Sequence, residues 1–142
     1  MIKEAIKKAE TMIDQRAYKE AVSALREIKN NLAEDSKNRL YIDFLIGKAL
    51  YLDSSFHESS EMFESVLVHS ERLFGRSHCF TLRTLDLLAR SKSRCGCHRE
   101  ASRFYLRESF CRMGKSPMDA KMISESYNLY CLEKENSYAI KS

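Results

Sequence analysis

The chain has 142 residues, of which 44% are hydrophobic and 31% charged, a balance that is typical of a folded soluble domain and excludes general disorder. One proline and four glycines are too few for a protein of many strands and turns, and no apolar run approaches the roughly 18 residues of a membrane span. The formal net charge is +4, and five cysteines cannot all pair within one chain, so we expect reduced thiols and a cytoplasmic or nuclear protein.

Along the chain, apolar residues recur at steps of three and four, the period of amphipathic helices. The N-terminal segment is charged from its third residue and lacks the apolar stretch of a secretory signal, so it is interpreted as the first helix. The expected helices cover about residues 2–13, 18–30, 40–52, 56–73, 81–94 and 98–113. Ser116 and Pro117 then have the order of a cap and a first helical residue, which predicts a seventh helix over about 117–136.

The six paired helices contain an internal repeat. Small residues stand twelve apart in each pair, where two helices must approach closely: Ala9 and Ala21, Gly47 and Ser59, and Ala89 and Ala101. Four positions after the second small residue of each pair stands a large residue: Leu25, Phe63 or Tyr105. Nine positions after the first small residue stands a ring: Tyr18, Phe56 or His98. The spacing predicts three units, about 2–38, 40–75 and 80–113, within a single domain of residues 1–142.

These positions resemble the tetratricopeptide repeat (TPR). The segment 73–89, with Leu73, Gly75 and His78 leading into a Thr-Leu…Leu-Ala helix, resembles the longer repeats of kinesin light chains. The pattern departs from the family at Lys8 and Lys92, where an apolar residue is usual, and at Glu108, where a small one is preferred. The resemblance implies an all-α, right-handed solenoid of three helical hairpins with a C-terminal capping helix.

Family members bind peptides or helices of other proteins in a groove lined by the first helix of each pair. The resemblance therefore implies a protein-interaction module or adaptor, not an enzyme. The alternative from the same family is a structural scaffold subunit that self-associates or docks permanently, as TPR subunits of ubiquitin ligases do.

Basic residues gather in the third unit. Residues 1–71 carry 10 basic and 13 acidic side chains, whereas residues 72–115 carry 11 and 3. Arg83, Arg90 and Arg94 share one helical face by their spacing, and Lys48 has the same place one unit earlier. In the family register all four face the groove, which predicts an acidic peptide or helix as the ligand, because guanidinium groups bind carboxylates and phosphates. The alternative is a solvated basic surface.

Other chemistry has little support in the sequence. Cys95, Cys97 and His98 lack the spacing of a zinc site, so we expect no metal and no cofactor. A small thiol enzyme would use Cys97 or Cys79, but only His78 stands beside a candidate thiol. Arg99, Arg103 and Arg107 form a second basic row on the following helix. Without interleaved aromatic residues, this row does not indicate nucleic-acid binding.

Overall fold

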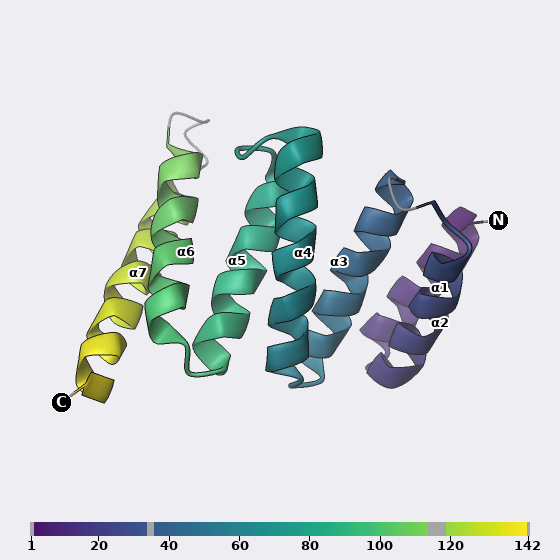
Figure 1. The fold of residues 1–142 in the computed structure, drawn as a ribbon, viewed down its shortest axis with the longest axis horizontal. Coiled ribbons are helices and arrows are strands. Elements are labelled where there is room, and N and C mark those ends of the chain that lie inside the picture. The colour runs from purple at the N-terminus through teal and green to yellow at the C-terminus, as the bar shows by residue number, and fades with distance from the viewer. Residues whose placement is uncertain (1, 34–35, 114–118, 142) are drawn as a thin grey trace. The chain divides into compact units, whose positions relative to one another are not determined.

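The computed structural model describes residues 2–33, 36–113 and 119–141, and side chains are described up to residue 113 and from 124 to 136. The described residues form α-helices and no strand (Figure 1). In chain order the helices are α1 (Ile2–Asp14), α2 (Tyr18–Asn30), α3 (Lys37–Leu52), α4 (Phe56–Phe74), α5 (Cys79–Arg94), α6 (His98–Arg112) and α7 (Asp119–Lys141). The predicted all-α class and the seven expected helices are confirmed in this part of the chain.

The chain divides into two compact units, Met1–Val66 and Leu67–Ser142, and the border falls inside α4. The expected caps of the seventh helix, Ser116 and Pro117, lie outside the described residues.

The three helical hairpins turn in the same way. In each hairpin, the residue seven positions after the small residue of the first helix has a positive φ. The values are 66° at Arg16, 66° at Ser54 and 82° at Gly96. The next amide N–H then donates to the carbonyl five residues back, at 2.8 Å from Ala17 to Met12 and at 2.9 Å in the other two turns. This is the Schellman arrangement that ends helices with a left-handed residue. The shared turn places the rings Tyr18, Phe56 and His98 at the heads of α2, α4 and α6, as the repeat predicts.

In the N-terminal unit the small residues lie at the closest helix contacts. Ala9, Ala21 and Ser59 are at most 1% exposed, and the Ser59 hydroxyl donates to the Gly47 carbonyl at 2.9 Å. A Cβ at Gly47 would lie 2.9 Å from a ring carbon of the fully buried Phe63. The absence of a side chain at Gly47 therefore allows the Phe63 ring of α4 to pack against α3.

Two helices begin earlier than predicted, because a cap that sequence reasoning did not identify precedes each of them. Ser36 accepts a hydrogen bond from the Asn38 amide at 3.2 Å, so α3 begins at Lys37. The imidazole of His78 accepts from the Phe80 amide at 3.1 Å, so α5 begins at Cys79. Such caps satisfy amide groups that have no partner inside the helix.

The segment that resembles kinesin light chains builds the entry to α5. Gly75 has a φ of 92°, and its carbonyl accepts from the Thr81 hydroxyl at 2.9 Å. The Phe74 ring stacks on His78 with centroids 4.7 Å apart. Glycine supplies the backbone geometry, and the ring and hydroxyl fix the chain that leads into the helix.

In the C-terminal unit α7 packs beside α6 (Figure 1), and its inner face has both polar and apolar residues. Ser126 and Glu133 are buried at 2% and 4% exposure, and Leu129 and Tyr130 between them pack on the cluster of Ala89, Ala101 and Tyr105. Tyr127 and Leu132 lie away from this contact, because both are 51% exposed. The inward positions 126, 129, 130 and 133 follow the helical period, which places residues 127 and 132 on other sides of the helix.

Candidate functional site

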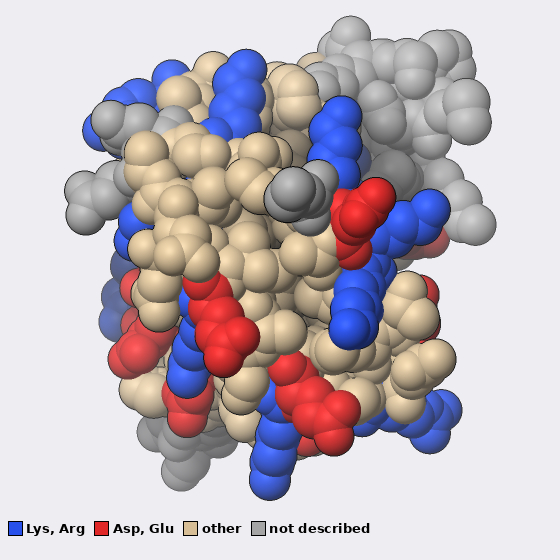
Figure 2. Space-filling view, turned by 90° about the vertical axis from the view of Figure 1, so that its right-hand side faces the viewer, with Lys and Arg blue, Asp and Glu red and all other residues tan. Residues whose placement is uncertain are grey.

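The distribution of charged side chains around α1 and α2 differs from that on α5 and α6. Around α1 and α2 basic and acidic side chains alternate over an otherwise uncharged surface (Figure 2). Most of the basic residues between positions 72 and 115 lie instead on α5 and α6 of the C-terminal unit. These two helices therefore contain the candidate site.

The predicted arginines of α5 lie on its accessible side. Arg83 and Arg94 are exposed, and the Arg90 side chain is 42% exposed. Leu87, on the same side, is half-buried, whereas Leu85, Leu88 and Ala89 are at most 1% exposed. We call Arg83, Arg90 and Arg94 the α5 basic face.

Arg90 is not an isolated cation within this face. Its Nε donates to the Asp86 carboxylate at 2.9 Å, one turn earlier on the same helix. The helical spacing predicted that Arg90 is available to a ligand, but Asp86 already engages it. The ion pair fixes the guanidinium in place and reduces its net charge.

Lys48 is half-buried on α3 of the N-terminal unit. It has the place of Arg90 in the repeat, because it follows Gly47 as Arg90 follows Ala89. A common surface of Lys48 and the three arginines stays a prediction.

The second basic row, on α6, is mixed in character. Arg99 and Arg103 are exposed. Arg107 forms an ion pair with Glu71 near the end of α4. On the same helix, Glu100 pairs with Lys92 at 3.1 Å and Glu108 pairs with Arg112.

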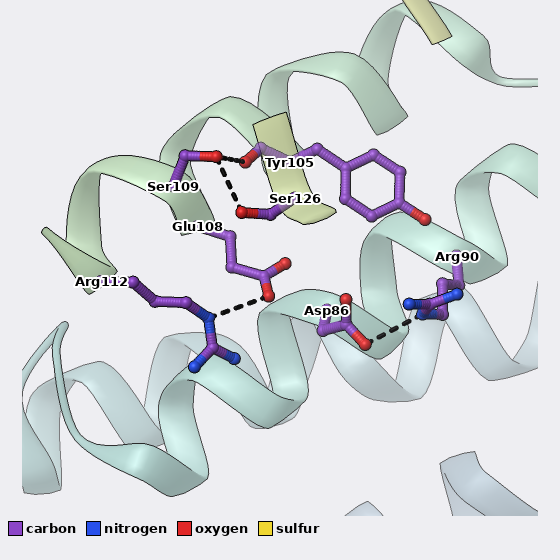
Figure 3. Close-up of polar contacts among 7 residues, drawn as sticks. All are labelled: Asp86, Arg90, Tyr105, Glu108, Ser109, Arg112 and Ser126. Carbon is purple, nitrogen blue, oxygen red and sulfur yellow. Dashed lines mark hydrogen bonds and ion pairs between the residues drawn. The ribbon is translucent and has the colours of Figure 1, made fainter. Parts of the chain in front are cut away.

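A polar cluster that sequence reasoning did not predict joins α5 and α6 and includes Arg90 of the α5 basic face (Figure 3). Its members are Asp86, Arg90, Glu108 and Arg112, and we call them the Glu108 cluster. Glu108 is 3% exposed and accepts from the Arg112 Nε at 3.1 Å. On the α7 side, the Ser109 and Ser126 hydroxyls lie 2.8 Å apart. The signal in the sequence was Glu108 itself, at a position where the repeat prefers a small residue, with Arg112 one turn later.

Glu108 has an unusual protonation equilibrium. Burial, reinforced by the negative charge of Asp86, raises its pKa from 4.5 to about 8, although Arg112 opposes the shift. Burial also raises the pKa of Tyr105 well above its ordinary value. The cluster therefore contains one carboxyl group that is mostly neutral at pH 7.

The candidate thiol Cys79 and the imidazoles of His78 and His98 have neighbours that the structure defines. The Cys79 sulfur lies 3.9 Å from Nδ1 of His78, but that nitrogen already accepts the capping hydrogen bond from the Phe80 amide. The imidazole of His98 pairs with Glu133 of α7. Burial, followed by the nearby Cys97 thiol, raises the pKa of Cys95, so Cys95 is less reactive than an ordinary thiol.

Within the part of the chain that the structure describes, no group of three or more histidine, cysteine or acidic residues could hold a metal ion. None of the helices searched there combines the length and hydropathy needed to cross a membrane.

Solved structures with the same fold place the chain in a structural class. It matches the crystal structure of a Podosopora anserina protein, described as a kinesin light chain with nearly identical TPR-like repeats, at a TM-score of 0.74 and 16% identity. The match spans 95% of this chain and 69% of that chain, and a single-substitution variant of the same protein matches equally well. No protein-family model matches the chain, and no curated protein sequence does. The chain thus has the TPR-like helical-repeat fold.

Proposed function

We propose that this chain is a protein-interaction module that binds an acidic segment of a partner protein on the α5 basic face. The observation that carries the proposal is the placement of Arg83, Arg90 and Arg94 on one accessible side of a single helix. In TPR-like repeats the first helix of each hairpin lines the groove, and α5 is such a helix.

The chemistry of this face favours carboxylate or phosphate groups. Guanidinium groups bind both in a bidentate way, and each charge-assisted hydrogen bond contributes roughly 1.5 to 3 kcal/mol. Leu87, half-buried among the arginines, adds an apolar contact for a side chain of the partner. Lys48 would extend the same preference if it faces the ligand.

The experiment compares two charge reversals. An acidic peptide selected from a peptide array is titrated by fluorescence anisotropy against Arg83→Glu, on the α5 basic face, and against Arg103→Glu, which is exposed on α6. We expect Arg83→Glu to weaken binding at least tenfold and Arg103→Glu to change it little. Equal losses in both variants would mean that only net charge matters, and a loss in Arg103→Glu alone would place the site on α6.

Arg90→Glu is a poorer probe than the sequence suggests. It would place a third carboxylate beside Asp86 and the buried Glu108, so lost binding could reflect lost folding. Arg83 and Arg94, both exposed, are the better positions.

A second candidate function is a structural subunit that self-associates or docks permanently. Phe110 and Met113, at the end of α6, are 62% and 55% exposed, and such apolar side chains are common in protein interfaces. Light scattering separates the two functions, because a stable dimer that Phe110→Ser disrupts would favour the scaffold.

The proposal includes no catalytic role and no cofactor, and it places the protein in the cytoplasm or nucleus. The thiol-enzyme alternative would need Cys79 or Cys97 to be reactive. Labelling of both thiols that leaves partner binding intact would agree with the binding function, and thiol-dependent turnover of any substrate would contradict it.

A further inference from the structure

Glu108 has a buried acceptor atom without a donor. Among the described residues, three buried carboxylate oxygens have no hydrogen bond: Asp43 Oδ1, Glu71 Oε1 and Glu108 Oε2. Asp43 Oδ1 lies 2.7 Å from the Lys29 ammonium, and Glu71 pairs with Arg107, so both have a cation beside them. Glu108 Oε2 accepts no hydrogen bond, although Oε1 of the same carboxyl accepts one from Arg112.

The groups around Glu108 come from three helices. From α5 they are Asp86 and Arg90, from α6 Tyr105 and Arg112, and from α7 Glu125. Asp86, Arg90, Glu108 and Glu125 line a pocket of about 60 Å³ together with Ser126 and Leu129. With every acid ionised, three carboxylates would face two guanidinium groups, so one proton would balance the charge.

We propose that Glu108 is protonated in the resting protein, that it donates a hydrogen bond to Asp86, and that this proton keeps Arg90 available to an acidic ligand. The inference rests on the proposed function and assigns a regulatory role to a buried residue beneath the α5 basic face. In Figure 3 the Glu108 carboxyl lies between Arg112 and Asp86, and Asp86 leads on to Arg90.

Loss of the proton would weaken the binding of an acidic ligand. Ionised Glu108 would put a second negative charge beside the Asp86–Arg90 pair, so Arg90 would be more fully neutralised and the surface above it less positive. Because the pKa of Glu108 is raised to about 8, the change falls between about pH 7 and pH 9. Affinity for a carboxylate ligand should therefore decrease as the pH rises through this range.

The first test needs no ligand. Carbon-13 NMR of the side-chain carboxyl groups of the full chain, recorded from pH 4 to 9.5, should show Glu108 titrating with a midpoint above 7. Arg90 Hε should shift with the same midpoint, and this shift should vanish in Glu108→Gln, which keeps the donor and the acceptor. A Glu108 midpoint near 4.5, or an Arg90 signal that ignores Glu108, would overturn the inference.

The second test measures the ligand. The probe is a rhodamine-labelled peptide of aspartate and glutamate, without histidine or phosphate, so that its charge is constant between pH 6.5 and 9. Its affinity for the parent chain should fall roughly twofold to fivefold over this range, the effect of one added charge near a partly exposed ion pair. Glu108→Gln should bind as the parent does at pH 6.5 and show no such fall.

The two proposals fail separately. If the peptide binds at no pH, the proposed function is wrong while the NMR titration still decides the state of Glu108. If the peptide binds with the same pH dependence in Glu108→Gln, the proposed function stands and Glu108 does not regulate it.

Discussion

At the residue scale, the turn positions give the cleanest test of the repeat register. Arg16, Ser54 and Gly96 occupy the same left-handed position in their hairpins, and only Gly96 reaches it without a steric cost. We expect Ser54→Gly to stabilise the protein by roughly 0.5 to 1 kcal/mol. Gly96→Ala should destabilise it by about 1 kcal/mol through the backbone alone, because nothing lies within 4 Å of the added Cβ. Urea denaturation measures both, and effects of the opposite sign would contradict the shared turn.

The Gly47–Phe63 contact limits side-chain size on α3. A Cβ there meets three ring carbons at 2.9 to 3.1 Å, and the fully buried ring cannot move away. Gly47→Leu should therefore cost about 3 kcal/mol, the upper part of the usual range for overpacking. Combining it with Phe63→Ala should recover part of that loss. Additive costs in the double variant would show that the two residues do not meet.

Glu108 makes stability depend on pH. Its folded pKa of about 8 lies above its ordinary value of 4.5, so the folded state retains a proton that the unfolded state releases. The contribution of Glu108 to the free energy of unfolding is greatest below pH 4.5. Between pH 4.5 and pH 8 it falls by up to about 1.4 kcal/mol per pH unit, and above pH 8 it levels off. Glu108→Gln should remove this slope and raise the melting temperature at pH 7.5. A variant that melts lower than the parent at that pH, with the same slope, would contradict the assignment.

Some of these residues could be predicted from the sequence and others could not. The small pairs were predictable, because close helix contacts demand small side chains at a fixed spacing. The Asp86–Arg90 and Glu108–Arg112 pairs were not, because acids and arginines one turn apart are also common on solvated helix faces. Only the burial of Glu108 distinguishes its cluster from such a surface.

At the element scale, α7 shows how a closing helix can dock through polar groups. Glu133 hydrogen-bonds to the Ser93 hydroxyl of α5 and pairs with His98 of α6. Hydrophobic periodicity could not assign the inner face of this helix, because its exposed side carries Tyr127 and Leu132. Helix ends were similarly uncertain where an unrecognised cap, such as His78, extended the helix.

Glu133→Ala should detach α7 partly from the rest of its unit. The change removes two partly buried hydrogen bonds to the Glu133 carboxylate and should cost about 2 kcal/mol. Hydrogen exchange should accelerate in α7 first. Glu135→Ala, at an exposed position of the same helix, is the matched control and should change neither stability nor exchange. Equal effects of both variants would show that general loss of helicity, and not docking, is responsible.

At the scale of the whole molecule, the repeat pattern predicted the fold more completely than the site. Helical hairpins of this kind are specified by residues near in sequence, so a single sequence contains most of the information. A binding face depends on which charges are already neutralised by neighbouring residues, as Arg90 is by Asp86. Only the packed structure gives this information.

Inversion of charge specificity tests the central claim most directly. The double variant Arg83→Glu/Arg94→Glu changes the two exposed arginines of the α5 basic face, and its affinity is measured for an acidic peptide and for the same peptide with every acid replaced by lysine. We predict that the parent binds the acidic peptide at least tenfold more tightly and that the double variant prefers the lysine peptide. A double variant that keeps the acidic preference of the parent would show that the partner binds elsewhere.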